Sequence, residues 1–533
     1  MRRGRLPRRG VSMLAYSAMA VVALVGAQAI IDPSAVNLYC TIIATIAASV
    51  TAMHCLRYKI VSRFPISSFA VLGFCITTYA LPVVAQTFSG RPLIYNLLVP
   101  RETFEASVEF QAVILLAHIT YTSVQALQFP SRWLSERILR PIWIFRMPGA
   151  MEFWALGIMG MGATWISRIL YSDAVEFGNV GGKFLQALVI FIVAPFFIPF
   201  RSYFLSTPQK NPPLTTPLLI AYFGLVIVTA VFFNARGVFA IVIFTVLISA
   251  FMMVAMRRVT FSRRAKIMIV IAAFAIVPLA SVAQDLATAM QVARLLRGST
   301  DPTGIAMETL RAFSDKKLLE ETRKDELSQT MDTGYSGYSE IYLQSEFFQR
   351  LTYTKYTDLT MAASLRLTQF QKDAIKRDSY ESIVSILPTP LIGFFGLDVK
   401  KDDRNFSTGD VYANLAFNQE LGGYRTGSSI TNSIDVLDVF WPPVIYVICI
   451  ILFIEFDSYC LWSGGKMMIS GIAFVLLYEI VARGLVYDSF RSLIDNMTRA
   501  YIQAVFVYTL LTLGTRLALF AFARPPQRRV RHA

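Results

Sequence analysis

Long apolar segments, separated by short polar and basic ones, dominate the pattern of this chain. A hydrocarbon core about 30 Å thick needs roughly 20 apolar residues in a helix. On that basis the pattern predicts twelve membrane-spanning helices, at 11–31, 35–56, 64–88, 106–127, 150–171, 184–204, 216–233, 238–256, 267–283, 441–454, 467–486 and 499–522. The tenth is the shortest and begins with prolines. We therefore expect an all-α fold, a polytopic membrane bundle of about twelve helices with one long, mostly helical external segment.

Composition excludes most other classes of protein. Of the 533 residues, 55% are hydrophobic and 16% are charged, whereas soluble domains average about 25% charged residues. Too little polar surface is present to solvate so much apolar side chain in water, so a bilayer has to be the main solvent. Soluble multidomain, disordered, collagen-like and disulfide-stapled proteins are excluded.

Basic residues mark one side of the predicted bundle. Clusters lie at the N-terminus, at 57–63, at 132–146, at 257–266 and at 524–531. With an even number of spans all five fall on the same side, which the positive-inside rule assigns to the cytoplasm. Both termini are then cytoplasmic. The first span is interpreted as retained, because it is longer than the roughly 7–15 apolar residues of a cleaved signal peptide.

The chain divides into three predicted parts. Residues 1–283 form a membrane domain with nine spans, 284–440 form an external domain, and 441–533 form a second membrane domain with three spans and a basic tail. The external part carries a net charge of −5, against +20 for the rest of the chain. Because the basic residues lie in short clusters between spans, we expect no nucleic acid partner.

The external part is predicted to be helical in its first half. Apolar residues recur at helical spacing over 289–297, 306–327 and 340–375, and the residues beyond Pro390 have the composition of an ordered loop. Tyrosines accompany these segments at positions 335, 338, 342, 353, 356, 380, 412 and 424. Aromatic faces suit sugar binding, but aromatics at helical spacing also serve in packing, and we assign about half of the set to packing.

Arginines at the predicted external ends of spans form a second feature, because positive charge there runs against the orientation rule. They are Arg101, Arg168, Arg236, Arg483 and Arg499. The guanidinium fork suits paired contacts with phosphate oxygens, although a single arginine can equally reach lipid headgroups. Arg236 lies in a turn so short that two spans meet across it, which favours a functional role there.

Histidine and cysteine chemistry is restricted. The three histidines, His54, His118 and His532, lie outside the external part, so that part has no histidine base and no histidine-activated nucleophile. His118, on an apolar helix, is interpreted as a hydrogen-bonded packing residue. The sequence has no Walker loop, no CxxC pair and no His/Cys cluster. We expect neither a metal nor a cofactor.

Three features together resemble bacterial oligosaccharide repeat-unit polymerases of the O-antigen polymerase type. The first is a many-span architecture with a single long external segment before the last spans. The second is the turn 234–237 (NARG) at the beginning of a span. The third is 387–391 (LPTPL) followed by 422–429 (GGYRTGSS). O-antigen ligases carry an external histidine that this chain lacks, so the likeness favours a polymerase over a ligase.

The resemblance implies a membrane glycosyltransferase in the bacterial inner membrane. Such an enzyme joins lipid-carrier-linked oligosaccharides into a surface polysaccharide or exopolysaccharide at the outer face. The polyprenyl pyrophosphate of the donor leaves as an acceptor sugar hydroxyl attacks. External arginines can stabilise the leaving group, and a carboxylate can orient or deprotonate the hydroxyl.

Site residues and partners follow from the same resemblance. We expect Arg236, Arg425 and Asp410 to be catalytic, with Asp435 and Asp438 as alternative carboxylates. Residues expected to bind substrate are Arg168, Arg483, Arg499 and Tyr424. The expected partners are the polyprenyl-pyrophosphate-linked oligosaccharide, membrane lipids, a chain-length regulator and a flippase.

Two other functions stay open. A transporter or flippase of a lipid-linked saccharide would need polar or charged residues at mid-membrane depth. Glu479 is the one clear carboxylate at such depth in the predicted topology, and a transporter would leave the long external part unexplained. A structural subunit of a polysaccharide export complex, with no chemistry of its own, is the third possibility.

Overall fold

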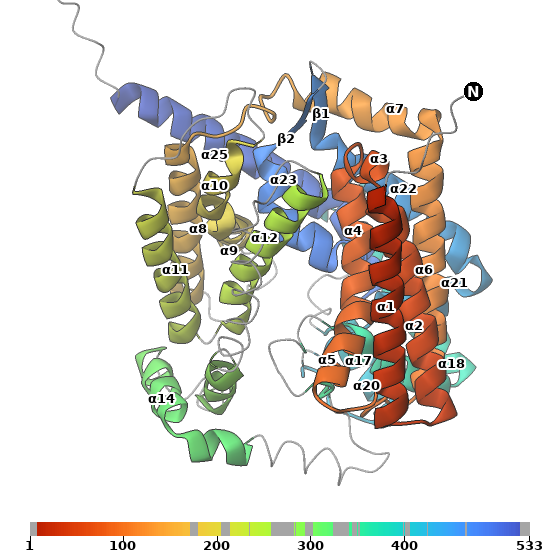
Figure 1. Cartoon of the computed structure of the whole chain (residues 1–533). Helices are drawn as coiled ribbons and strands as arrows, with labels where there is room; N and C mark the ends of the chain where they lie inside the picture. The colour runs from red at the N-terminus through yellow and green to blue at the C-terminus, as the bar shows by residue number, and fades with distance from the viewer. Residues whose placement is uncertain are drawn as a thin grey trace, which may run out of the picture.

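The computed structural model describes residues 8–170, 180–203, 214–233, 235–256, 282, 284–293, 302–322, 340–343, 349, 352–387, 389–397, 399, 406–423, 425–463 and 466–522. It is about 81% helical (Figure 1). Within the described part, the sheet content is one antiparallel pair of strands, with Cys460 opposite Ile469. The all-α class predicted from the sequence is confirmed at this level.

Helices of very different length follow one another along the chain. The first half contains α1 (Arg8–Ile31), α2 (Ala35–Cys55), α3 (Tyr58–Val61), α4 (Pro65–Cys75), η1 (Ile76–Ala80), α5 (Leu81–Phe88), α6 (Pro100–Ser123), α7 (Gln125–Trp133), η2 (Leu134–Leu139), α8 (Ala150–Leu170), α9 (Val180–Val189), η3 (Ile190–Phe197), α10 (Ile198–Arg201), α11 (Thr215–Phe232) and α12 (Arg236–Ala255). The second half contains α14 (Pro302–Ser314), α17 (Thr354–Arg366), α18 (Gln369–Val384), α19 (Thr389–Phe394), α20 (Thr408–Phe417), α21 (Ser429–Leu437), η4 (Asp438–Phe440), α22 (Trp441–Ser458), β1 (Cys460–Ser463), β2 (Lys466–Ile469), α23 (Gly471–Val475), η5 (Glu479–Arg483), α24 (Phe490–Asp495), η6 (Asn496–Ala500) and α25 (Tyr501–Phe522).

Seven helical segments in the described part are long and apolar enough to cross a membrane. They are Ala35–Cys55, Pro65–Phe88, Ala150–Leu170, Gly181–Arg201, Thr215–Phe232, Ser429–Ser458 and Phe490–Ala521. This is a helical membrane protein, with fewer spans described than the twelve expected. Two expected spans appear only as shorter apolar helices, Ala18–Ile31 and Ile241–Ala255, and the one expected at 267–283 lies almost wholly outside the described residues.

Two of the basic clusters, 57–63 and 132–146, are described, and they lie at one end of the molecule, which we call the basic end (Figure 1). Arg516 of α25 donates to Glu152 at the start of α8 (Nε–Oε1, 3.0 Å) and to the Arg146 carbonyl (3.0 Å). The end of α25 therefore lies beside the 140–149 connection, at the end that also holds α3 and α7 (Figure 1). Helices α14, α17, α18 and α20 lie at the opposite end, which we call the loop end (Figure 1).

The predicted span at 106–127 is interrupted near its end. Helix α6 stops at Ser123 because Val124 is extended, and the α7–η2 segment leaves at an angle of 81°. Gln128 stabilises this corner, since its Nε2 donates to the carbonyls of Tyr121 (3.3 Å) and Thr122 (3.0 Å). These are carbonyls that the end of a helix leaves without an intrahelical partner. The α7–η2 segment therefore runs across the basic end instead of continuing the span.

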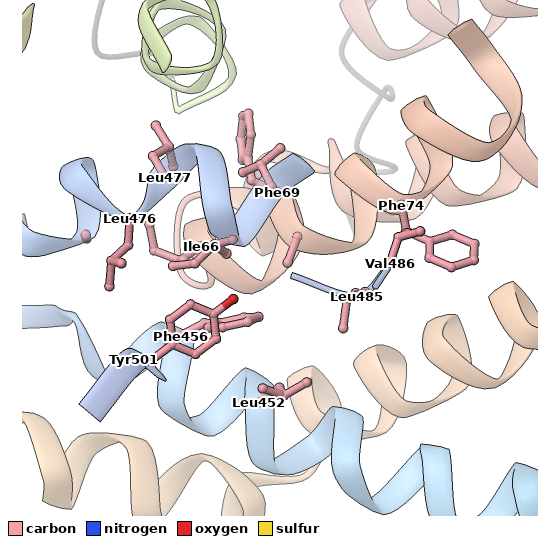
Figure 2. Packing of buried hydrophobic residues seen from close by; sticks show 14 of the residues in the cluster. Ile66, Phe69, Phe74, Leu452, Phe456, Leu476, Leu477, Leu485, Val486 and Tyr501 are labelled. Carbon is pink, nitrogen blue, oxygen red and sulfur yellow. The ribbon is translucent and has the colours of Figure 1, made fainter. Parts of the chain in front are cut away.

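The span predicted at 467–486 is not one continuous helix. That stretch consists of β2, the short helix α23 and the π-helical turn η5, followed by an irregular turn before α24. A helix over 471–483 would be only about 20 Å long, less than the hydrocarbon thickness. Its side chains are buried in the protein interior beside α4, as Leu476, Leu477 and Val486 show in Figure 2.

A close backbone contact explains why this stretch is buried against α4. We call the segment 466–495, from β2 to α24, the buried hairpin. A Cβ added at Gly73 of α4 would lie 1.6 Å from the Val481 carbonyl oxygen. Ile472, Leu477 and Ile480 are fully buried. Hydropathy scores a segment buried in protein the same way as one exposed to lipid, so the sequence pattern could not separate the two cases.

The part predicted to be external, 284–440, contains two regions among its described residues. In 284–322, Ala289, Ala312 and Leu319 form a small core of their own. In 352–440, helices α17, α18, α20 and α21 contribute buried residues to the main core instead. Asp358 of α17 is also fully buried, and it accepts the backbone N–H groups of Leu98 and Val99 (2.9 Å each). This carboxylate fastens the second region to the start of α6.

Two expectations about this part need correction. Residues 340–343 are not helical. Helix α17 lies within the expected 340–375 helix, and α18 begins within that range and ends beyond it. The residues beyond Pro390 were expected to be a loop, yet they contain α20 and α21. Ser407 caps α20 by accepting the backbone N–H of Asp410 (3.1 Å), so a polar residue that favours loops serves here to begin a helix.

Candidate functional site

A pocket of about 430 Å³, the charged pocket, lies between α9 and the α24–η6–α25 segment. Its charged lining consists of Lys183, Glu479, Arg491, Asp495 and Arg499. Amides and apolar side chains complete the wall, among them Gln186, Asn496, Gln503, Leu476 and Ile190. Three cations and two carboxylates leave the lining positive by one charge.

The pocket belongs to the half of the molecule toward the loop end. Helix α8 begins at the basic end, where Glu152 meets Arg516, so it ends toward the loop end. Helix α9 follows it in the chain, and Lys183 lies in its first turn. The pocket is therefore lined from the beginning of α9.

Local sequence explains why three charged groups converge from one side. Arg491, Asp495 and Arg499 are four residues apart, a spacing that keeps side chains on one helical face. Ser489 begins this helix by accepting the backbone N–H of Ser492 (3.3 Å). The segment 496–500 is a π-helical turn, as is 479–483 on the other side of the pocket, and such turns occur frequently at functional sites.

Two buried polar atoms in this lining have no hydrogen-bond partner among the described residues, namely Arg491 Nε and Asp495 Oδ1. One is a donor and the other an acceptor. Leaving a buried polar group unpaired costs roughly 1–3 kcal/mol. The pair is therefore prepared for a ligand that offers both oxygen acceptors and hydroxyl donors.

Arg483 lies directly behind the charged pocket. Its Nη1 is 3.6 Å from Oε2 of Glu479, whose side chain lines the pocket. Of the residues expected to bind substrate, the structure thus brings Arg483 and Arg499 to one place. Lys183, Arg491 and Asp495 were missed. The four-residue spacing of 491, 495 and 499 was a usable signal, but nothing near Lys183 in the sequence pointed to this pocket.

Arg425 and Asp410, the expected catalytic pair, are together but outside the charged pocket. Asp410 is fully buried, and its Oδ1 accepts from Arg425 Nη1 (3.1 Å) and from the Arg425 backbone N–H (3.2 Å). Arg425 also donates to the Glu420 carbonyl (2.7 Å) and to Gln419 Oε1 (3.1 Å). This guanidinium is engaged in holding its own loop.

The glycine-rich run 422–429 connects that pair to the hairpin. Ser429 donates its backbone N–H to the Tyr487 carbonyl (2.8 Å), and Asn432 Oδ1 accepts from the backbone N–H of Phe490 (2.9 Å). A Cβ at Gly427 would lie 2.5 Å from the Asp488 carbonyl oxygen, so glycine permits the close approach. The run thereby positions the turn that leads into Arg491.

The other expected residues lie elsewhere. Arg168 is half-buried in the last turn of α8. Arg236 is the first residue of α12, and its side chain lies outside the described residues, as does the whole of Tyr424. Asp435 is buried and accepts from Tyr412 (2.7 Å) and Ser364 (2.8 Å). Burial next to Asp435 raises the pKa of the Tyr412 phenol.

A separate buried chain of polar groups crosses four helices near the basic end. His54 Nε2 lies 3.0 Å from His118 Nδ1, and His118 Nε2 lies 3.1 Å from Ser67 Oγ. Ser67 Oγ in turn donates to Asp457 Oδ2 (2.6 Å). His118 is fully buried and hydrogen-bonded, as its interpretation as a packing residue requires. The carboxylate bonds the serine and not the histidine, so this is not the arrangement of a Ser-His-Asp triad.

The described residues contain no group of three His, Cys, Asp or Glu side chains placed to hold a metal ion. The five cysteines are buried and unpaired with one another. No protein family model, no curated protein and no solved structure matches this chain. Function therefore has to be argued from the geometry of the site.

Proposed function

We propose that this protein polymerises oligosaccharide repeat units carried on polyprenyl pyrophosphate, at the outer face of a bacterial inner membrane. In this proposal the chain has about twelve spans, cytoplasmic termini and a periplasmic loop end. The acceptor hydroxyl oxygen forms the new bond to the anomeric carbon of the donor. The bond from that carbon to the pyrophosphate breaks, the pyrophosphate keeps the electron pair, and a carboxylate takes the hydroxyl proton.

The observation that carries the proposal is the charged pocket. Arg491 and Arg499 present two guanidinium groups on one helical face, with Lys183 opposite, and guanidinium forks suit the two phosphates of a pyrophosphate. The pocket also has an apolar side, formed in part by Leu476 and Ile190, as the isoprenoid end of a carrier lipid requires. Charge that develops on the leaving group would be stabilised without any nucleotide.

Asp495 is the carboxylate best placed to act as the base. Its Oδ1 is buried in the pocket lining without a partner among the described residues, whereas Asp410 and Asp435 are held by hydrogen bonds within the protein. Arg425 and Asp410 then act as positioning residues that hold 427–429 against the hairpin. Arg236 and Arg168 stay in the proposal as further cations at the loop end, and Tyr424 as a sugar contact.

The test is reconstitution. Purified protein in proteoliposomes would be supplied with a synthetic polyprenyl-pyrophosphate oligosaccharide, and the products would be separated by size. We expect polymer formation with release of polyprenyl pyrophosphate, and a rate about a hundredfold lower for Arg499→Lys, since one stabiliser of developing charge is worth about 3 kcal/mol. The matched control is Arg101→Lys, which changes an exposed arginine paired with Glu105 and should leave the rate unchanged. Unpolymerised donor with the wild-type protein would reject the proposal.

Transport of the same lipid-linked saccharide is the second candidate, and the buried chain from His54 to Asp457 favours it. Polar groups inside spans are costly and often mark a transport path. The liposome assay separates the two functions if donor is supplied on one side only. Movement of intact donor across the bilayer without chain growth would favour the transporter.

A further inference from the structure

A second pocket, of about 440 Å³, opens at the basic end, and we call it the basic-end pocket. It is enclosed by the α6–α7–η2 corner, the residues that precede α4, the end of α22 and strand β1. Its polar lining includes Arg63, Gln128, Arg132, Glu136 and Asp457. The charged pocket and the proposed polymerase function do not use it.

Two arginines in this pocket converge on a single acceptor. Arg63 Nη2 is 2.9 Å and Arg132 Nη2 is 3.4 Å from Gln128 Oε1. Gln128 is buried, and its Nε2 is committed to the corner of α6, so the amide oxygen is fixed toward the two guanidinium groups. Among the described residues, neither arginine has a carboxylate partner within 4.0 Å.

Two like charges held this close repel each other. The Nη2 atoms of Arg63 and Arg132 are both within hydrogen-bond distance of Gln128 Oε1, so the two guanidinium groups lie close together. An anion placed between them would relieve the repulsion and would receive two forked donors. The Tyr121 hydroxyl lines the same pocket, but it lies beside Asp457 and Ser131 and therefore belongs to the carboxylate side of the pocket.

The same pocket holds carboxylates, which decides what kind of anion fits. Asp457 is buried and receives two hydrogen bonds from Ser67. Glu136 is exposed on the same helical segment as Arg132. These groups repel a plain anion but attract a ligand whose phosphate is followed closely by an ammonium group.

The depth of the pocket points to a lipid. Helix α7 crosses the basic end with Phe129 64% exposed and Trp133 47% exposed, and Trp462 of β1 is 49% exposed. Large aromatic side chains exposed on a helix that lies across a span end are typical of the membrane interface. The pocket beneath α7 is therefore at the level of phospholipid headgroups.

We propose that the basic-end pocket binds the phosphoethanolamine headgroup of a membrane phospholipid. The phosphate lies between Arg63 and Arg132, the two arginines that converge on Gln128. The ammonium group faces Asp457 and Glu136. The bound lipid fastens the α6–α7 corner to β1 and hence to the buried hairpin.

The experiment is native mass spectrometry of the purified full-length protein, titrated with phosphatidylethanolamine, phosphatidylglycerol or phosphatidylcholine of identical acyl chains. We expect ethanolamine lipid to bind most tightly. The double variant Arg63→Ala/Arg132→Ala should weaken its apparent affinity about tenfold or more. The control is Arg137→Ala/Arg140→Ala, which removes the same charge from exposed residues next to the pocket that do not line it and should leave the affinity unchanged.

A single conservative variant tests the site without the risk that a double variant misfolds. Glu136→Gln should reduce the preference for ethanolamine over glycerol headgroups about threefold and leave glycerol lipid binding intact. If both arginine double variants lose affinity for the lipid to the same extent, surface charge alone explains the binding, and the proposed site is rejected. An unchanged preference in Glu136→Gln would overturn the ammonium assignment, and displacement of the lipid by millimolar inorganic phosphate would overturn the lipid assignment.

Discussion

Arg425 reaches back fifteen residues to Asp410, with Nη1 3.1 Å from Oδ1, and both groups are largely removed from solvent. The same carboxylate oxygen accepts the backbone N–H of Arg425. This pair fixes the beginning of the glycine-rich run that positions the buried hairpin. Its contribution is therefore to the shape of the charged pocket and not to its lining.

Breaking this pair should destabilise the protein. Asp410→Ala leaves a buried guanidinium without its partner, and we expect a loss of about 3 kcal/mol in the free energy of unfolding. Thermal unfolding of the detergent-solubilised protein, followed by tyrosine and tryptophan fluorescence, measures it. Glu105→Ala, which removes the partner of the exposed Arg101, is the control and should change stability by less than about 1 kcal/mol. Equal melting temperatures for the two variants would show that the Arg425–Asp410 pair does not stabilise the fold more than the exposed pair does.

Gly73→Ala tests the buried hairpin. The added Cβ would collide with the Val481 carbonyl, and forcing atoms into a packed core costs typically about 1–3 kcal/mol. Gly224→Ala in α11, where a Cβ meets nothing within 4 Å, is the matched control and should be neutral or slightly stabilising because alanine favours helix. A Gly73→Ala protein with wild-type thermal stability would contradict the close packing of α4 on 480–483.

Asp495→Asn should separate catalysis from binding. The amide keeps the size of the side chain but cannot accept the proton, so we expect kcat to fall by about two orders of magnitude or more with little change in KM. Steady-state kinetics with the lipid-linked donor measure both constants. A variant that raises KM and leaves kcat unchanged would assign Asp495 to binding. Glu479, the other carboxylate of the charged pocket, would then be the candidate base.

The sidedness of the chain is tested by reporter fusions. We expect a fusion at Thr330 to report the external side and a fusion at the C-terminus to report the cytoplasm, because the positive-inside rule assigns the basic clusters of the sequence to the cytoplasm. Equal signals from the two positions would show that the loop end is not periplasmic, and they would also reject the proposed polymerase function.

Polymer formation should not depend on a divalent cation. The charged pocket has arginine and lysine where a metal would otherwise neutralise the pyrophosphate. The proteoliposome assay would be run with EDTA and then with added Mg²⁺ or Mn²⁺. Activity lost in EDTA and regained with either ion would place a metal on the pyrophosphate, held by carboxylates such as Glu479 and Asp495.

The sequence by itself determined the class of the protein and most of its spans. The apolar stretches at 35–56 and 150–171 became α2 (Ala35–Cys55) and α8 (Ala150–Leu170) nearly residue for residue. Hydropathy and helix length are local properties, and a bilayer imposes the same length on every span. The position of 57–63 and 132–146 at the same end follows in the same way, since each crossing reverses the direction of the chain.

Only the tertiary structure decided which apolar segment is buried in protein and which charges meet. The stretch 467–486 is as apolar as a span, yet the packing of α4 against Val481 makes it a buried hairpin. Lys183 reaches the charged pocket only because α9 packs beside α25, more than three hundred residues further along the chain. Such contacts depend on how helices distant in sequence cross, and a one-dimensional pattern of hydrophobic and polar residues carries no information on those crossings.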